Sequence, residues 1–303
     1  MTNKQILLIG IGKMGLNMAE RLKEHQYDVI GFAPSDASRK LAEEHGLRVV
    51  HSISEGVTAL SAKKTVWLMV PHSAVDEVLR ELVPLLQVGD TVIDGGNSPY
   101  KESQRRAKEL ALEGVRFLDA GVSGGPSGAR NGACIMVGGM AEVYAEYEEL
   151  FRDLSAPEAY IRAGESGAGH FVKMVHNGIE YGMMQAIAEG FGVMKASPFN
   201  LDLQSVAGLY NHQSVITSRL TGWLEGAYAQ YGTRLDSVSG TVAHTGEGAW
   251  TIEAAHELGV AVPIIEGSLE FRKQSVEHPS YTGQVLSALR NQFGGHDIGG
   301  PRK

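Results

Sequence analysis

This chain of 303 residues has one cysteine, no long apolar run and no excess of positively charged residues. The single cysteine, Cys134, excludes a disulfide framework and a cysteine-based zinc site. It stands in the apolar run ACIMVGG and is expected to be a buried, reduced core residue. No apolar run approaches the roughly 20 residues that a membrane-spanning helix needs. No signal-peptide pattern precedes the first apolar run, so we expect a cytoplasmic protein without a membrane partner.

The net charge of −8 argues against nucleic acid as the main partner. An anionic small molecule remains compatible with this charge, because a local site can be basic on an acidic protein. Glycine is abundant at 38 residues, and many glycines cluster directly after apolar runs. Such glycines let the backbone turn sharply or approach a ligand closely.

The first half of the chain alternates β-rich runs with amphipathic helical segments. The runs that predict strands cover residues 5–10, 28–32, 65–70, 91–97 and 115–125. The segments that predict helices cover residues 14–24, 36–45, 71–86 and 98–110. We expect Ser73 to cap the third helix, with Asp76 three residues on, and Ser98 to cap the fourth, with Pro99 at its first position. This alternation predicts an α/β fold with a parallel, doubly wound sheet.

Beyond about Gly164 the β-rich runs become rare and long helical patterns continue to the C-terminus. We therefore expect a Rossmann-type dinucleotide-binding domain over residues 1–165. An all-α domain for substrate binding and oligomerisation is expected over residues 166–303. The glycine-rich tail, residues 294–303, cannot form a helix interior and should either be loose or reach a partner subunit.

The motif GIGKMG follows the first strand and opens the first helix. Its glycines are Gly10, Gly12 and Gly15. This is the dinucleotide-binding fingerprint in its required context, where glycines let a pyrophosphate approach the helix N-terminus. The alternative is a tight strand–helix turn without a ligand.

The end of the second strand usually selects the cofactor, because an acidic residue there binds the ribose 2′-hydroxyl of NAD. Ala33 stands at that position. Ser35 can hydrogen-bond a 2′-phosphate and Arg39 or Lys40 can pair with it, which favours NADP over NAD. Asp36 opposes this preference, and Arg39 and Lys40 can also be ordinary solvated helix residues.

Two further polar loops follow strands of the predicted sheet. Asn97 ends the stretch DGGN and can hydrogen-bond a nicotinamide amide or a substrate hydroxyl, unless it merely precedes the cap at Ser98. The stretch GVSGGPSGARNG is a second glycine-rich loop, in which Ser123 and exposed backbone N–H groups can cradle an anion. The alternative is a loop in which Asn131 and Gly132 form a turn.

The stretch GHFVKMVHNGIEYGMMQ, residues 169–185, predicts one helix with a polar stripe. At about 100° per residue, His176, Asn177 and Glu180 lie roughly −60°, +40° and −20° from Lys173. The same stripe then becomes apolar, at Met184, Ile187 and Phe191. A solvated face would not change in this way, so we expect the stripe to line a cleft that closes into the core.

A lysine and a carboxylate in such a cleft suit general acid–base catalysis. The alternative is an ordinary amphipathic helix, in which the polar stripe faces water. The residues opposite the stripe are apolar: Phe171, Val172, Val175 and Ile179.

At this helix the sequence resembles the decarboxylating 6-phosphogluconate dehydrogenases. The resemblance covers nearly the whole chain, through GIGKMG, DGGNS, GVSGGPSGARNG, HTGEGAWT and RNQFGGH, and K-x-x-H-N-x-x-E is its most specific part. The chain length is similar to that of the short-chain branch of the family. The resemblance implies a Rossmann domain with a helical domain, and oxidation of 6-phospho-D-gluconate to D-ribulose 5-phosphate and CO2 without a metal.

The resemblance also implies roles for the polar stripe. Lys173 would be the general base that takes the proton of the C3 hydroxyl, and Glu180 the general acid that protonates C1 of the product. His176 and Asn177 would hold substrate oxygens. The remaining substrate contacts would come from Asn97, Ser123, Gly124 and Gly125.

At the phosphate end, Tyr181 and Thr251 match binding positions of the family. Arg290 and His296 match a pair that the family supplies from a neighbouring subunit, which implies a homo-oligomer. Ala249 is a departure, since the family usually carries arginine or lysine there. Losing a cation should weaken phosphate binding by about 1–3 kcal/mol. Arg272 or the adjacent Lys273 is expected to compensate.

The residues expected to bind NADP or NAD are Gly10, Gly12, Lys13, Met14, Gly15, Ser35, Val70 and Asn97. A second hypothesis is a β-hydroxyacid dehydrogenase or imine reductase acting on an unphosphorylated substrate, which Ala249 favours. A third is a non-catalytic dinucleotide sensor, which would have no reason to keep both Lys173 and Glu180.

Overall fold

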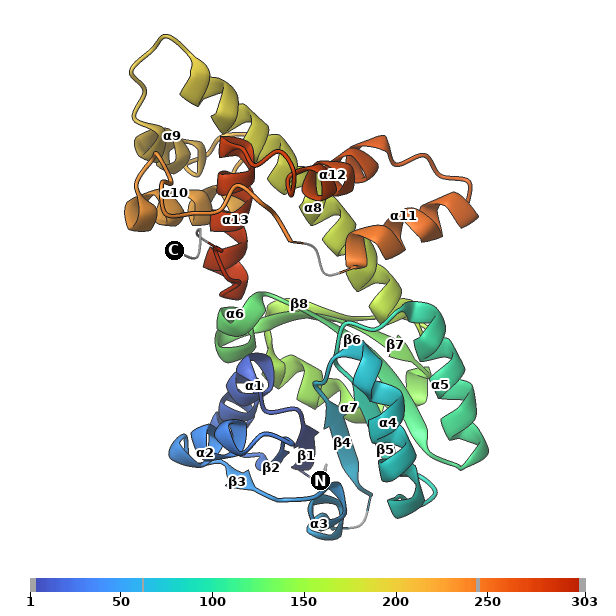
Figure 1. Ribbon diagram of the computed structural model, residues 1–303. Helices are drawn as coiled ribbons and strands as arrows, with labels where there is room; N and C mark the ends of the chain where they lie inside the picture. Colours follow the sequence, from blue (N-terminus) through green and yellow to red (C-terminus); the bar gives the residue numbers. More distant parts are fainter. Residues whose placement is uncertain (1–3, 62, 244–245, 300–303) are drawn as a thin grey trace. The chain divides into compact units, whose positions relative to one another are not determined.

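The computed structural model describes residues 4–61, 63–243 and 246–299 (Figure 1). The chain divides into two compact units, Met1–Met174 and Val175–Lys303. The boundary between them falls inside one long helix, α8 (Ala168–Ala196). The first turns of α8 thus belong to the first unit and the rest to the second.

The first unit is built on an eight-stranded sheet in the order β3-β2-β1-β4-β5-β6-β7-β8. Its strands are β1 (Gln5–Ile9), β2 (Asp28–Phe32), β3 (Arg48–Val49), β4 (Thr65–Leu68), β5 (Thr91–Asp94), β6 (Arg116–Ser123), β7 (Ala133–Gly139) and β8 (Ser155–Gly164). The predicted doubly wound α/β sheet is confirmed, and its strands β1 to β6 are parallel.

One strand runs the other way: β7 is antiparallel to β6, and β8 is parallel to β7. The connection between β6 and β7 contains only the short helix α6 (Gly125–Asn131). A parallel crossover needs about a dozen residues or more, so this connection is too short for one. The predicted strands are thus all parallel, and the antiparallel strand β7 lies beyond them, in a segment that the sequence did not predict as a strand.

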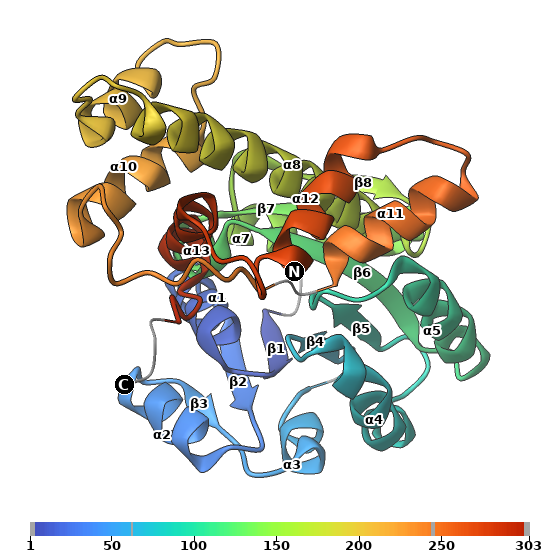
Figure 2. The same ribbon diagram turned by 45° about the horizontal axis from the view of Figure 1, so that its top comes forward.

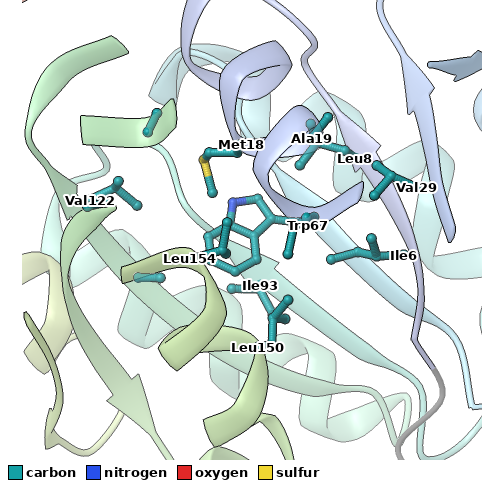
Figure 3. Packing of buried hydrophobic residues seen from close by; sticks show 14 of the residues in the cluster. Ile6, Leu8, Met18, Ala19, Val29, Trp67, Ile93, Val122, Leu150 and Leu154 are labelled. Atoms are coloured by element: carbon teal, nitrogen blue, oxygen red, sulfur yellow. The ribbon is translucent and has the colours of Figure 1, made fainter. Parts of the chain in front are cut away.

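Helices cover both faces of the sheet (Figure 2). They are α1 (Lys13–Glu24), α2 (Asp36–Glu44), α3 (Ile53–Thr58), α4 (His72–Leu82) with the 3-10 turn η1 (Val83–Leu85), α5 (Tyr100–Leu112), α6 and α7 (Ala141–Leu154). Successive side chains of β1 point to opposite faces, so Leu7 and Leu8 lie in different apolar clusters. Trp67 is fully buried in one of them, among Met18, Leu150 and Leu154 (Figure 3).

Three local predictions are wrong. Ser73 lies inside α4, whose N-cap position is Pro71. Pro99 is the N-cap of α5, and Ser98 instead donates its hydroxyl to the buried carboxylate of Asp94 at 2.8 Å. Cys134 is exposed on β7, because side chains alternate between the two faces of a strand and apolar neighbours do not fix which face is covered.

The described part of the second unit consists of helices and their connections, as predicted for an all-α domain. After α8 come α9 (Leu203–Tyr210), α10 (Arg219–Tyr231), α11 (Glu247–Glu257), α12 (Pro263–Gln274) and α13 (Tyr281–Gly294). The apolar continuation of the polar stripe enters the core of this unit. Met184 and Phe191 are buried there, and Ile187 packs against them. None of the described helices is both long and apolar enough to cross a membrane.

The chain after α13 packs on its own unit. Gly295 caps the helix in the left-handed conformation, and the carbonyl of Ile298 accepts a hydrogen bond from the backbone of Ser239 at 2.8 Å. The described part of the tail is therefore not loose. Residues 300–303, the end of the tail for which a partner contact was expected, lie outside the described residues.

Candidate active site

The fingerprint glycines form a cradle at the carboxyl end of β1. Gly10 has φ +103°, and a Cβ atom added there would overlap the carbonyl oxygen of Met69. A Cβ added at Gly15 would overlap the carbonyl of Gly10, so the strand and the helix touch backbone to backbone. Gly12 is the N-cap of α1 without a side-chain cap, and no atom of the described residues lies within 4 Å of an added Cβ. The helix N-terminus is thus open to an anion, which fits a dinucleotide pyrophosphate.

The neighbouring strands bring more of the predicted cofactor residues to this edge. The sheet order reverses between β1 and β4, which is where dinucleotides bind in open α/β sheets. Val70, after β4, lies 3.1 Å from an added Cβ at Gly10. Gly96, after β5, would place an added Cβ 2.7 Å from the carbonyl oxygen of Val70. Lys13 and Met14 begin α1, soon after the end of β1, and Asn97 follows the end of β5.

Several polar side chains of the β2–α2 turn make hydrogen bonds within the turn itself. The hydroxyl of Ser35 caps α2 by accepting from the backbone of Ser38 at 3.4 Å. The guanidinium of Arg39 donates to the carbonyls of Ala33 and Pro34 and pairs with Asp36. Arg39 therefore closes this turn, and Asp36 competes with any phosphate for its guanidinium.

A buried network of hydrogen bonds and ion pairs holds the residues on either side of Asn97. Its side chain is exposed, whereas Gly96 and Ser98 on either side are buried. Asp94 accepts from the Gly96 backbone at 3.1 Å and from the Ser98 hydroxyl at 2.8 Å. Arg106, only 2% exposed, donates to both Asp94 and Ser98 from α5. The sequence did not single out Arg106, since it looks like any other charge on an amphipathic helix.

The stretch predicted as the second glycine-rich loop is the end of β6 followed by α6. Ser123 is the last residue of the strand, and Gly124 and Gly125 both have positive φ, +123° and +63°. Arg130 ties α6 to α1 by donating to Glu24 at 2.8 Å. The two left-handed glycines turn the chain at the carboxyl edge of the sheet, next to the strand that ends before Asn97.

Lys173 lies on the first turns of α8 and is only 7% exposed. A Cβ added at Gly121 of β6 would overlap the Cβ of Lys173 and lie 2.9 Å from its Cγ. The lysine stem therefore rests on the backbone of the strand that ends at Ser123. A lysine whose stem is fixed in this way can hold its amine at one place, which suits a general base.

The other members of the stripe continue along α8. His176, Asn177 and Glu180 are each partly buried. The ring Nδ1 of His176 lies 3.0 Å from Oδ1 of Asn177 and 3.9 Å from Oε2 of Glu180. The carboxylate, the imidazole and the amide thus form one polar group on the helix.

An arginine pair occupies the second unit beside Tyr181. Arg272 of α12 is 1% exposed and its guanidinium carbon lies 3.4 Å from the centre of the Tyr181 ring. Burial lowers the pKa of Arg272 to about 10, and the positive charge of Arg290 lowers this pKa further. The carboxylates of Glu180 and Glu247 act in the opposite direction. Burial also lowers the pKa of Arg290. The site therefore holds two desolvated cations close together.

The guanidinium of Arg272 is incompletely satisfied. Among the residues that the structure describes, its Nε and Nη1 have no hydrogen-bond partner, and Nη2 meets only the Met184 sulfur at 3.9 Å. Lys273 is exposed, because neighbouring helix residues point about 100° apart. Of the two cations expected to compensate for Ala249, Arg272 is thus the one beside Tyr181.

Helix α11 completes this cluster by close packing on α8. An added Cβ at Gly178 would lie 2.6 Å from Thr251, and one at Gly248 would lie 2.7 Å from the Tyr181 ring. Thr251 is buried and donates its hydroxyl to the carbonyl of Glu247 at 2.9 Å. Ala249 is exposed, on the other side of the helix.

Arg290 and His296, the pair that the resemblance assigns to the phosphate end, contact different groups. Arg290 on α13 is 7% exposed and interacts electrostatically with Tyr181 and Glu247 of its own chain. His296 lies past the end of α13, with its ring 6.0 Å from that of Phe293. Within residues 4–61, 63–243 and 246–299, no three His, Cys, Asp or Glu side chains gather as metal ligands would.

Comparison with known proteins decides the family. Residues 5–166 match the NAD binding domain of 6-phosphogluconate dehydrogenase, and residues 169–284 match the C-terminal domain of the same enzyme. The chain belongs to the 6-phosphogluconate dehydrogenase family. As in the family, a dinucleotide-binding domain precedes a helical domain, and the division between the matched regions falls at the start of α8.

Relatives of this family match the chain over nearly its full length. The NAD(+)-dependent, decarboxylating 6-phosphogluconate dehydrogenase of Haloferax volcanii is 38% identical over 97% of this chain and 98% of its own. The Bacillus subtilis protein YqeC, provisionally named as a 6-phosphogluconate dehydrogenase, is 46% identical over 96% and 98%.

Solved structures agree with this family. The 6-phosphogluconate dehydrogenase of Plasmodium falciparum, solved with NADP+ and with 6-phosphogluconate, superposes with a TM-score of 0.82 at 28% identity, over 99% of this chain and 67% of its own. A 3-hydroxyisobutyrate dehydrogenase of Mycobacterium tuberculosis shares the fold, with a TM-score of 0.73 at 20% identity over 94% and 99%.

Proposed function

We propose that this protein oxidises and decarboxylates 6-phospho-D-gluconate to D-ribulose 5-phosphate and CO2, with NAD or NADP as the oxidant. The observation that carries the proposal is the buried Arg272, which has two N–H-bearing nitrogens without a described partner and Arg290 beside it. Two desolvated guanidiniums suit a dianionic phosphate, which accepts charge-assisted hydrogen bonds. An unphosphorylated hydroxy acid would leave the two unpaired nitrogens of Arg272 without an acceptor.

In the proposed reaction Lys173 accepts the proton of the C3 hydroxyl. When bound, the nicotinamide supplies the oxidising power by accepting the hydride from C3. Lys173 then carries a positive charge beside the new C3 ketone and polarises it. Because the lysine stem is fixed against Gly121, its amine is held ready near the substrate and little ordering is needed.

Decarboxylation follows from the chemistry of the β-keto acid. The bond between C1 and C2 breaks, CO2 leaves, and the electron pair passes to the C3 oxygen, which takes the proton from Lys173 to form an enediol. Glu180 donates a proton to the carbon that lost CO2, and Lys173 takes back the enol proton as the ketone forms. The adjacent His176 and Asn177 hold substrate oxygens.

The remaining substrate contacts follow the placement of the loops. Asn97, Ser123, Gly124 and Gly125 bind the carboxylate and hydroxyl region. At the phosphate end the proposed ligands are Tyr181, Thr251, Arg272, Arg290 and His296.

The cofactor would be held by the cradle of Gly10, Gly12 and Gly15, with Lys13, Met14, Val70 and Asn97 around it. Ser35 and Arg39 favour NADP over NAD at the ribose, and Asp36 limits this preference. Both nicotinamide cofactors are therefore expected to work.

A second candidate is a β-hydroxyacid dehydrogenase acting on an unphosphorylated substrate. It is supported by Ala249, which is exposed and replaces the cation usual in the family. Such an enzyme would reduce the cofactor without forming CO2.

We also propose a homo-oligomer. Beside the polar stripe of α8 lies an exposed apolar stripe, with exposed fractions of 40% for Val172, 53% for Ile179, 44% for Met183 and 72% for Val193. Their spacing of seven, four and ten residues keeps them on one side of the helix, as in helix–helix interfaces. His296 would be the residue that a neighbouring subunit contributes to the phosphate end.

The test is an assay of the purified protein with 6-phosphogluconate, and with gluconate as the unphosphorylated control, each with NAD and NADP. The expected result is reduced cofactor and CO2 in equal amounts from 6-phosphogluconate alone. Reduced cofactor without CO2 would establish the second candidate. Cofactor binding without turnover of any hydroxy acid would establish a sensor.

Two variants test the roles on α8. Lys173→Met is expected to abolish oxidation, and Glu180→Gln to slow turnover strongly while leaving 6-phosphogluconate binding intact. Full activity in either variant would refute the role given to that residue.

A further inference from the structure

Strand β6 carries three residues that point to one face of the sheet. Asp119, Gly121 and Ser123 alternate along the strand, and side chains two residues apart share a face. Ser123 is a proposed substrate ligand, and Gly121 lies against Lys173. Asp119 is completely buried and belongs to neither the proposed catalytic nor the proposed binding residues.

The carboxylate of Asp119 caps α8 from this strand. It accepts hydrogen bonds from the backbone N–H of Gly167 at 2.6 Å, through Oδ1, and of His170 at 2.9 Å, through Oδ2. The first N–H groups of a helix have no partner within the helix, and a negative charge is favourable at that end. The cap thus comes from about 50 residues away in sequence and ties the first turn of α8 to β6.

The packing around this cap leaves no room for side chains. An added Cβ at Gly169 would lie 2.6 Å from both the carbonyl oxygen of Asp119 and the backbone nitrogen of Gly138. An added Cβ at Gly121 would lie 3.0 Å from the carbonyl oxygen of Gly169 and would overlap the Cβ of Lys173. The first turn of α8 therefore lies directly on the backbone of β6 and β7.

A second tie holds the same turn from α5. The ring Nδ1 of His170 lies 2.7 Å from the hydroxyl of Ser103, and both residues are buried. Asp119 binds the backbone of this turn and Ser103 binds the side chain of His170. The turn that precedes Lys173 is therefore restrained in position and in rotation.

We propose that Asp119 is a positioning residue that sets where the amine of Lys173 stands relative to a substrate held at Ser123. Gly121 and Ser123 are two residues apart on β6, which is about 6.6 Å along a strand and within the reach of a lysine side chain. Displacement of a catalytic group by about 1 Å can reduce the rate roughly 100-fold. The inference rests on the proposed function, in which Lys173 is the general base.

The main test is Asp119→Asn, which keeps the shape and one acceptor oxygen but loses the charge and one backbone hydrogen bond. The expected result is a kcat reduced roughly 10- to 100-fold, with the KM for 6-phosphogluconate and the Kd for the cofactor within about threefold. Amide hydrogen exchange of Gly167 and His170 is expected to increase, while exchange in α13 stays the same.

A rescue experiment separates positioning from general damage. In Lys173→Ala, added methylamine can supply a base that is not attached to α8. Introducing Asp119→Asn into that variant is expected to change the amine-rescued rate by less than about twofold, since no lysine remains to be positioned. An equal loss in both backgrounds would overturn the proposal.

Gly121→Ala is a second, independent variant, since its added methyl group displaces Lys173 directly. It is expected to lower kcat at least as much as Asp119→Asn. Gly267→Ala is the matched control and should behave as wild type, because Gly267 is exposed on α12 and none of the described residues comes within 4 Å of an added Cβ.

Three outcomes keep the proposal separate from the proposed function. Wild-type kcat in Asp119→Asn would overturn the positioning role while leaving Lys173 as the base. Unchanged hydrogen exchange at Gly167 and His170 would overturn it without any activity measurement. Full activity in Lys173→Ala would refute the base assignment itself.

Discussion

The guanidinium carbon of Arg272 lies 3.4 Å from the centre of the Tyr181 ring, and both residues are buried. The ring face offers a partial counter-charge to the cation, but it supplies no hydrogen-bond acceptor for the N–H groups. A buried cation of this kind destabilises the protein without ligand and binds an anion strongly when one arrives.

Replacing Arg272 by methionine is expected to stabilise the protein without ligand, by about 1–4 kcal/mol of unfolding free energy, because the buried charge is removed. The same change should raise the KM for 6-phosphogluconate by at least roughly 10- to 100-fold, from the loss of charge-assisted hydrogen bonds of about 1.5–3 kcal/mol. Urea unfolding and steady-state kinetics measure the two effects.

The matched control for Arg272 is its exposed neighbour, Lys273→Met, which should change neither quantity appreciably. Inorganic phosphate should raise the thermal midpoint of the wild type and of this control, but not that of Arg272→Met. A less stable Arg272→Met that still binds 6-phosphogluconate normally would contradict the phosphate site.

Removing the carboxylate of Asp36 should shift cofactor preference towards NADP. In Asp36→Ala the guanidinium of Arg39 loses its charged partner and becomes available to a 2′-phosphate. We expect the ratio of kcat/KM for NADP to that for NAD to rise about tenfold, equivalent to about 1.4 kcal/mol. Arg39→Ala should lower the same ratio. If neither variant changes it, the ribose site lies elsewhere.

A charge on the exposed face of α8 should dissociate the proposed oligomer. Ile179 and Met183 are exposed in the single chain, so Ile179→Asp and Met183→Asp should leave its fold intact. Sedimentation analysis is expected to show an oligomer for the wild type and smaller species for both variants. Val88→Asp, at a residue 85% exposed in the first unit, is the control that should sediment as wild type. A monomeric wild type would refute the proposal.

Buried tyrosines predict a loss of stability at high pH. Burial, together with the hydrogen bond of 2.9 Å to the hydroxyl of Tyr281, raises the pKa of Tyr228 above its ordinary value. Above about pH 10 this phenol ionises in the unfolded chain but not in the folded one, so the unfolded state binds fewer protons. The free energy of unfolding therefore falls as pH rises, by up to about 1.4 kcal/mol per pH unit for each such tyrosine.

Urea unfolding between about pH 9 and 11 checks this expectation. Tyr228→Phe should be less stable near neutral pH by about 1 kcal/mol, because the hydrogen bond is lost, and should show a shallower fall at high pH. Parallel curves for the two proteins would contradict the role given to Tyr228.

Local sequence patterns predicted much of this architecture. The alternation of β-rich runs and amphipathic helices, the fingerprint at Gly10 and the stripe headed by Lys173 depend on spacings of two and 3.6 residues, which tertiary contacts do not alter. The apolar continuation at Met184 and Phe191 indicated that the stripe enters the core, and the structure confirms it. The family motifs added the proposed chemistry.

Contacts between distant segments decided the rest. Periodicity could not tell that Ile179 and Val172 would be exposed while Lys173 is buried, because which face of a helix is covered depends on its neighbours. The choice of Arg272 over Lys273 as the cation beside Tyr181 depends in the same way on how α12 packs.

The cap of α8 by Asp119 has no local signal, since about 50 residues separate the carboxylate from the N–H groups that it accepts. In the sequence, Asp119 is a single polar residue within an apolar strand. Only the folded structure shows the helix that this carboxylate stabilises. The sequence thus determines which side chains are available for catalysis, whereas the meeting of β6 with α8 determines where the base stands, because only folding brings a carboxylate to a distant helix N-terminus.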